Sequence, residues 1–260
     1  MRLKDKSALV TGAGSGIGKS IAEAFAREGA CVATADLNLS AAQMVSEQIN
    51  LAGGRAIHLQ MDVADEDQVN AGAEQVVREF GALDLLVSNA GIQIINPIVD
   101  FSFADWRKLV AIHLDGAFLT TRAAMRAMIS QGRGGTILYM GSVHSHLASP
   151  NKSAYVAAKH AIVGLAKAVA KEGAKHGIKS NIICPGFVRT PLVEKQIPEQ
   201  AQQLGITEEE VVKKVMLGQT VDGEFTSMED VAATAVFLAS FPSSALTGQS
   251  IMVSHGWFMH

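Results

Sequence analysis

The sequence predicts an α/β fold in which a doubly wound parallel sheet of about seven strands carries helices on both faces. Short apolar runs alternate along the chain with longer amphipathic runs, which is typical of strands joined by crossover helices. The short runs are apolar throughout, as strands covered on both faces require. No internal repeat or low-complexity linker divides the 260 residues, so we expect a single domain spanning residues 1–260.

Each element is assigned from its own residues. Apolar and β-branched runs, beginning with "SALVT", predict strands at 7–11, 31–36, 55–60, 83–89, 135–141, 178–184 and 248–254. Apolar residues that recur three or four positions apart, as Ile21, Ala24 and Phe25 do, predict helices near 17–28, 40–51, 66–80, 104–130, 153–175 and 228–239.

One segment interrupts this alternation. Residues 190–225 are polar and partly helical, and they lie between the sixth and seventh predicted strands. Long segments of this kind in compact domains are usually functional, so we expect a helical, mobile cover over a binding site. The alternative is a surface insertion without a role.

The composition excludes several classes of protein. The formal net charge is −3 without a basic patch, so no nucleic-acid partner is expected. No apolar run approaches the length of a membrane span. Cys31 and Cys184 lie in apolar segments, where we expect small buried hydrophobic side chains in a reducing compartment. We therefore expect a soluble cytoplasmic protein without a membrane partner, and no metal ligands are predicted.

A glycine-rich turn follows the first predicted strand. Gly12, Gly16 and Gly18 are spaced G-x-x-x-G-x-G, with Ser15 and Ile17 between them, and a helix follows. Glycines allow the backbone to approach a pyrophosphate, and a helix N-terminus supplies N–H donors and partial positive charge. Such turns also merely close strand–helix corners. The position in the first strand–helix turn of a β/α pattern favours a dinucleotide site.

Asp36 ends the second predicted strand, 18 residues after the last of these glycines. At about this interval an acidic residue binds the ribose 2′-hydroxyl of a dinucleotide. A carboxylate there repels a 2′-phosphate, so we predict NAD rather than NADP as the cofactor. The alternative is a surface aspartate at a strand end.

Two further strand ends belong to the same predicted crevice, because dinucleotides bind at the carboxyl ends of parallel strands. Asp62 and Val63 follow the third strand, where an adenine is expected. Asn89, Ala90 and Gly91 follow the fourth strand, and these residues leave room for the second ribose and the nicotinamide. Both sets are also compatible with plain turns.

Tyr155 and Lys159 are four residues apart on a predicted helix and share one face. A free tyrosine has a pKa near 10 and is a poor base at neutral pH. A cation about 5 Å away contributes on the order of 3 kcal/mol at an effective dielectric constant of 20. Lys159 is therefore expected to lower the pKa of Tyr155 toward that of a general base, and the oxidised nicotinamide is expected to add a second positive charge. Ser142, at the end of the fifth strand, can hydrogen-bond the same substrate oxygen. The alternative is a packed tyrosine and a solvated lysine.

With these motifs the chain resembles the short-chain dehydrogenase/reductase family over nearly its full length. The matching stretches are "TGAGSGIG", "SNAG", Ser142, "YVAAK" and "CPGFVRTP". The resemblance implies a single Rossmann-like domain, a homotetramer, and Ser142, Tyr155 and Lys159 as catalytic residues. It also implies that Tyr155 and Lys159 contact the cofactor, and that the nicotinamide is lined by Pro185, Gly186, Val188 and Thr190.

One position departs from the family. An asparagine usually holds a water molecule on the proton path behind the lysine, and His113 occupies that place in "LVAIHLDGAF". Histidine can also hydrogen-bond a water molecule, so we include His113 among the candidate catalytic residues. The alternative is a buried structural histidine.

The candidate substrate residues resemble one subgroup of the family, the bacterial D-3-hydroxybutyrate dehydrogenases. The resemblance implies that the substrate carboxylate is bound by Gln93, His144 and Lys152. It also places Gln196 on the mobile cover and Trp257 in the cavity wall near the methyl end of the substrate. It implies oxidation of (R)-3-hydroxybutyrate to acetoacetate, in which Tyr155 takes the hydroxyl proton. The chain reads "VSHGW" where the subgroup often has "VDGGW", so Ser254 and His255 depart from its pattern.

Two other functions remain open at this stage. One is a dehydrogenase for another hydroxy acid, a sugar acid or a cyclic alcohol. The other is a protein that binds NAD without turnover, which only the histidine at position 113 suggests.

Overall fold

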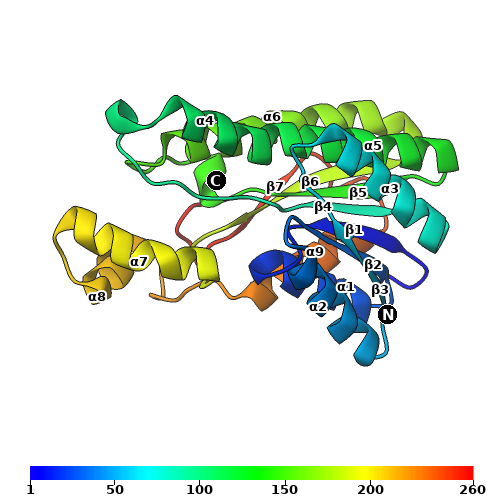
Figure 1. The fold of residues 1–260 in the computed structure, drawn as a ribbon, viewed down its shortest axis with the longest axis horizontal. Coiled ribbons are helices and arrows are strands. Elements are labelled where there is room, and N and C mark those ends of the chain that lie inside the picture. The colour runs from blue at the N-terminus through cyan, green and yellow to red at the C-terminus, as the bar shows by residue number, and fades with distance from the viewer. Residues whose placement is uncertain (260) are drawn as a thin grey trace.

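Figure 1 shows the computed structural model, which describes residues 1–259, the side chain of residue 192 excepted. Within these residues, parallel strands form one sheet in the order β3-β2-β1-β4-β5-β6-β7. The chain starts at the middle of the sheet and winds outward in both directions, which confirms the predicted fold. The strands are β1 (Ser7–Thr11), β2 (Cys31–Asp36), β3 (Arg55–Gln60), β4 (Leu85–Ser88), β5 (Gly135–Met140), β6 (Ile178–Pro185) and β7 (Ser250–Val253).

Helices cover both faces of the sheet. One face carries α1 (Gly16–Arg27), α2 (Leu39–Leu51) and α9 (Met228–Ser240), and the other carries α3 (Glu66–Phe80), α5 (Gly116–Gln131) and α6 (Ser153–Gly173) (Figure 1). Successive residues of β1 serve the two faces, because side chains alternate along a strand. Val10 belongs to the apolar cluster beneath α1 and α9, whereas Leu9 belongs to the cluster beneath α3 and α5.

The predicted helix at 104–130 is interrupted in the structure. Its two parts are α4 (Phe103–Val110) and α5, and a π-helical turn over Ala111–Asp115 joins them. This turn carries His113, whose imidazole contacts the backbone of Ile92. Such turns often mark functional sites. The other predicted strands and helices agree with the structure to within two residues at each end.

Cys31 corrects a smaller expectation. It is half-buried rather than buried, because it begins β2 where the strand is not yet fully covered, whereas Cys184 within β6 is buried.

The predicted cover is helical. It consists of α7 (Pro191–Leu204), the short α8 (Glu208–Glu210) and a π-helical turn over Val211–Met216, and Figure 1 shows it beside the sheet. The cover has a small apolar core of its own, formed by Val193, Ile197, Val211 and Met216. It therefore packs as a separate layer, and its mobility stays a prediction. No helix within residues 1–259 is long and apolar enough to cross a membrane.

Candidate active site

A cavity of about 430 Å³ lies at the carboxyl ends of the parallel strands. The chain winds outward from β1 on one side and from β4 on the other, and such a switch point is where ligands bind in open α/β sheets. Every candidate site residue from the sequence lines this cavity except Gly18. The structure thus brings together residues from position 12 to position 257.

Gly18 acts beneath the cavity. A Cβ atom there would lie 2.2 Å from the carbonyl oxygen of Gly12 and 2.6 Å from Nδ2 of Asn89. Only glycine therefore allows α1 to pack this closely under the turn. Gly12 has a positive φ of 63° and Gly16 one of 54°, which side chains disfavour.

The N-terminus of α1 is open toward a ligand. Ser15 is its N-cap residue and makes no side-chain capping hydrogen bond, so the first N–H groups of the helix lack that partner. Because Ser15, Gly16 and Ile17 line the cavity, these donors fit the pyrophosphate of a dinucleotide.

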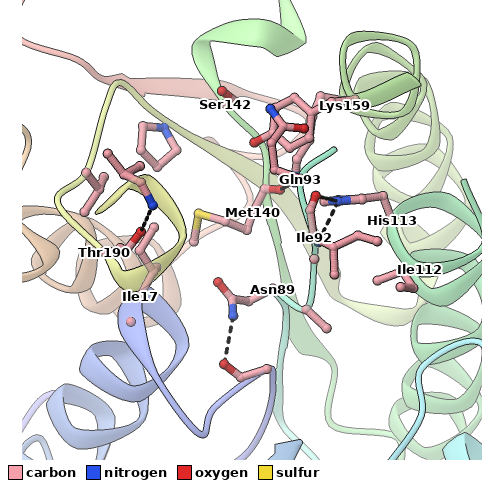
Figure 2. A pocket seen from close by; sticks show the side chains of 18 of the residues that line it. Ile17, Asn89, Ile92, Gln93, Ile112, His113, Met140, Ser142, Lys159 and Thr190 are labelled. Carbon is pink, nitrogen blue, oxygen red and sulfur yellow. Dashed lines mark hydrogen bonds between the residues drawn. The ribbon is translucent and has the colours of Figure 1, made fainter. Parts of the chain in front are cut away.

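Asn89 lines the cavity and also braces the glycine turn. Its Nδ2 donates to the carbonyl oxygen of Thr11 at 2.9 Å and to that of Gly12 at 3.3 Å, and Figure 2 shows the Asn89 amide at the floor of the cavity. In return, Oγ1 of Thr11 accepts the N–H groups of Asn89 and Ala90 at 3.0 and 3.1 Å. Thr11 was not among the predicted site residues, although it carries a hydroxyl group at the end of a buried strand, directly before the glycine turn.

The Asp36 carboxylate is held in place by two backbone donors. Its Oδ2 accepts the N–H of Gly14 and its Oδ1 that of Asn38, both at 2.9 Å. A Cβ atom on Gly14 would lie 2.8 Å from Oδ2, so Gly14 is a further required glycine that the motif spacing did not indicate. The carboxylate lines the cavity, and this fits a ribose with two hydroxyl groups.

Tyr155, Lys159 and Ser142 all line the cavity, and Figure 2 shows Ser142 and Lys159 close together, away from Ile17. Nζ of the buried Lys159 donates to the carbonyl oxygen of Met140 at 2.5 Å and lies 5.4 Å from the centre of the Tyr155 ring. Burial lowers the pKa of Lys159 to about 8.

The expected acidification of Tyr155 by Lys159 is wrong for the protein without a ligand. Burial raises the pKa of Tyr155 to about 12, and hydrogen bonding with Ser142 opposes this shift only in part. The desolvation of a phenolate therefore outweighs the hydrogen bond from Ser142. Any base function of Tyr155 needs further positive charge in the cavity.

His113 is buried beside Tyr155, with the two ring centres 5.4 Å apart and the rings edge to face. Its Nε2 lies 3.0 Å from the N–H nitrogen and 2.7 Å from the carbonyl oxygen of Ile92. Its Nδ1 has no hydrogen-bond partner among the described residues. Burial, together with the charge of Lys159, lowers the pKa of His113 to about 3, so its imidazole is neutral. Gly91 must be glycine here, since a Cβ atom would lie 2.4 Å from Cε1 of His113.

Lys152 is a buried cation at this end of the cavity. It is 6% exposed, it forms no ion pair with any described residue, and burial lowers its pKa to about 8. Its Nζ lies 5.0 Å from the centre of the Phe187 ring. A buried cation without an acidic partner is unfavourable unless a ligand supplies the opposite charge. The cavity is therefore suited to an anion.

His144 and Gln93 add polar groups near Lys152. Nδ1 of His144 lies 3.3 Å from Oγ of Ser142, and its Nε2 lies 2.8 Å from Oγ of Ser149. Burial lowers the pKa of His144 to about 3, so it acts as a neutral hydrogen-bonding group. Oε1 of Gln93 is buried and has no hydrogen-bond partner among the described residues.

Aromatic side chains and a residue of the cover complete the wall of the cavity near His144. Trp257 stacks on Phe187 with ring centres 5.0 Å apart and planes 5° apart, and it meets His144 edge to face at 5.6 Å. Gln196 reaches the cavity from α7 and is buried. Phe187 was missed as a wall residue, although it lies within the stretch "CPGFVRTP".

Known proteins resemble this chain over almost its whole length. The family described as short chain dehydrogenase matches residues 6–201. The D-beta-hydroxybutyrate dehydrogenase of Rhizobium meliloti strain 1021 is 40% identical over 254 residues, covering 97% of this chain and 98% of the relative. The enzyme of the same name from Cupriavidus necator is 39% identical, with 98% of each chain covered.

A solved structure has the same fold. It is that of a short-chain type dehydrogenase/reductase from Mycobacterium marinum, with a TM-score of 0.91 and 35% sequence identity. The comparison covers 99% of this chain and 97% of that one.

Proposed function

Because the chain belongs to the short-chain dehydrogenase family, we propose that it catalyses the reversible NAD-dependent oxidation of (R)-3-hydroxybutyrate to acetoacetate. The observation that carries this proposal is Lys152, a buried cation that pairs with no described acidic side chain and shares a cavity with Tyr155 and Ser142. A small hydroxy acid supplies both the missing anion and a hydroxyl group for the tyrosine.

The dinucleotide is held by the elements at the carboxyl ends of β1 and β2. The N-terminus of α1 binds the pyrophosphate, Asp36 binds the adenosine ribose, and Lys159 binds the second ribose. When bound, the oxidised nicotinamide supplies a hydride acceptor and a positive charge. Val188 and Thr190 lie on the cavity wall where we place the nicotinamide amide.

The choice of NAD over NADP depends on the charge of Asp36. Asp36→Asn keeps a side chain of the same size but removes the repulsion of a 2′-phosphate. We expect the NAD preference, measured as the ratio of dissociation constants by calorimetry, to fall about a hundredfold. Asp67→Asn, on the exposed start of α3, is the control. An unchanged ratio would remove Asp36 from the ribose site.

Tyr155 removes the hydroxyl proton of the substrate. Its pKa of about 12 must fall for this step, and the cations near it are Lys159 and the bound cofactor. Ser142 donates a hydrogen bond to the substrate oxygen and holds it near the phenol. Nδ1 of His113, which has no hydrogen-bond partner among the described residues, is suited to hold a water molecule beside this group. The contact of its Nε2 with Ile92 also supports a purely structural role.

The carboxylate end of the substrate determines its orientation. Lys152 binds the carboxylate, and the amide of Gln93 donates a hydrogen bond to it. His144 lines the same part of the cavity, and the wall of Trp257 and Gln196 limits the methyl end. Holding both ends of a four-carbon acid fixes which face of C3 meets the cofactor, so these residues act by orientation.

The proposal also includes a homotetramer. Exposed phenylalanines occur on two separate helices, Phe118 on α5 at 48% and Phe237 on α9 at 45% exposure. Exposed aromatic side chains on two different helices support two kinds of subunit contact, which is what a tetramer with three twofold axes needs.

The test of the function is NADH formation with each enantiomer of 3-hydroxybutyrate. We expect turnover of the R form only, and a loss of turnover in Tyr155→Phe with NAD binding retained. Good turnover of a different alcohol, with none of the R form, would replace the substrate assignment. Binding of NAD without turnover of any alcohol would favour a non-catalytic protein.

A further inference from the structure

The segment that follows β7 places two aromatic rings against the turn that begins at Ser142. In this segment, Ser254–Phe258, Trp257 meets His144 edge to face at 5.6 Å, and Phe258 stacks on His146 at the same distance. The position of the segment Ser254–Phe258 therefore determines where Trp257 lies in the wall of the candidate active site.

The same segment is joined to the chain that leaves the cover. Nε1 of Trp257 donates to Oε1 of Gln219 at 2.5 Å, and the N–H of Val221 donates to the carbonyl oxygen of His255 at 2.9 Å. Nδ1 of His255 lies 2.6 Å from Oδ2 of Asp222. A Cβ atom on Gly256 would lie 2.7 Å from Cγ1 of Val221, so the two stretches are in close contact.

His255 has a backbone conformation that histidine rarely adopts. Its φ is +49°, in the left-handed region that favours glycine, and Gly256 follows with a φ of +71°. A strained residue of this kind persists only where the surrounding contacts hold it. His255 is held by the backbone hydrogen bond from Val221 and by the side-chain hydrogen bond to Asp222, which also lowers the pKa of the Asp222 carboxyl group.

We propose that His255 and Asp222 form a positioning clasp that fixes Trp257 in the cavity wall and thereby sets the room left for the end of the substrate. Only the effect of the clasp on substrate binding rests on the proposed function. It acts through Trp257, because neither His255 nor Asp222 lines the cavity. The histidine at position 255, which departs from the related sequence pattern, thus has a role as a positioning residue.

A single hydrogen-bonded pair near the surface contributes little to stability, and the side chains of His255 and Asp222 are 26% and 45% exposed. The effect of the clasp is expected to be local for this reason. Without the pair, residue 255 can relax toward negative φ, and Trp257 two residues later moves with it.

The test is a double-mutant cycle of His255→Asn and Asp222→Asn. Asparagine tolerates left-handed backbone, so His255→Asn removes the pair without forcing a new conformation. The control is Glu224→Gln, which removes one exposed charge from the same loop. Emission of Trp257 is recorded in a Trp106→Phe background, since the chain has two tryptophans, and kinetics are recorded with Trp106 intact.

We expect each single variant to shift Trp257 emission and to raise KM for (R)-3-hydroxybutyrate about two- to fivefold, with kcat nearly unchanged. The double variant should be no worse than either single one, because both remove the same contact.

Emission like that of Glu224→Gln in either single variant, or additive effects in the double variant, would overturn the clasp. Shifted emission of Trp257 with an unchanged KM would show that the clasp does not affect substrate binding. A wild-type protein inactive on this acid would overturn the proposed function, while the emission cycle would still decide on the clasp.

Discussion

Lys152 combines burial with charge at the start of α6. It is the N-cap residue of that helix, where a cation opposes the helix dipole, and no described acidic side chain pairs with it. A fall in pKa from 10.5 to about 8 corresponds to about 3 kcal/mol against the charged form in the empty protein. A position that is locally unfavourable in two ways is expected where a ligand requires the charge.

Lys152→Met is therefore expected to stabilise the empty protein by about 1–3 kcal/mol at pH 7 and to raise KM for the hydroxy acid. The unfolded lysine keeps its proton up to about pH 10.5 and the folded one only to about pH 8. The destabilisation by Lys152 is thus complete below pH 8 and disappears toward pH 10.5. Urea unfolding of this variant and of Lys167→Met, on the exposed side of α6, checks the prediction. A less stable Lys152→Met protein at pH 7 would contradict it.

The charge of Lys152 also predicts how carboxylate binding depends on pH. Butyrate lacks the hydroxyl group and serves as an unreactive competitor. Its inhibition constant should rise about tenfold per pH unit above pH 8, as the ammonium group loses its proton. In Lys152→Met the constant should be higher and flat through this range. If the rise persists in that variant, another group, such as Lys159, is the one that titrates.

At the scale of elements, the glycine turn and α1 form one closely packed unit. The Cβ distance of 2.2 Å from position 18 to the Gly12 carbonyl leaves no room for a methyl group. The Asn89 brace fixes the same carbonyl from the side of β4. The dinucleotide site is therefore set by contacts between two strands and a helix.

Gly18→Ala is expected to push α1 away from the turn, to destabilise the protein by about 1–3 kcal/mol, and to weaken NAD binding strongly. Gly164→Ala is the matched control, because a Cβ atom there meets nothing within 4 Å on the exposed side of α6. That variant should be more stable by about 0.5–1 kcal/mol. Thermal unfolding with and without NAD measures both effects. An equal response of the two variants would show that the packing beneath the turn is unimportant.

At the scale of the whole molecule, the exposed phenylalanines of α5 and α9 lie on opposite faces of the sheet. If each face contacts another subunit, breaking one should leave a dimer. Phe118→Glu and Phe237→Glu are each expected to convert the tetramer to dimers, measured by light scattering after size-exclusion chromatography. Leu51→Glu, on the 89% exposed end of α2, should not change the mass. A wild-type protein that is monomeric would refute the tetramer itself.

The elements and most of the candidate site follow from local patterns. Strand and helix order is readable because apolar periodicity reflects each element's own covered faces. The glycine spacing, the strand-end Asp36 and the Tyr155–Lys159 pair depend on residues close together in sequence. Their convergence in one cavity follows from the rule that parallel strands end on the same side.

The sequence by itself therefore determined the α/β architecture, the family, and a set of candidate site residues that all line the cavity except Gly18. Only the tertiary structure decided the direction in which the pKa of Tyr155 shifts and the burial of His113 on a π-helical turn. The hydrogen bonds between Asn89 and Thr11, and between His255 and Asp222, were likewise decided only by the tertiary structure. Each of these depends on how deeply a group is buried or on atoms brought together from distant parts of the chain. Desolvation and packing at a few ångströms arise only when the elements are assembled in three dimensions.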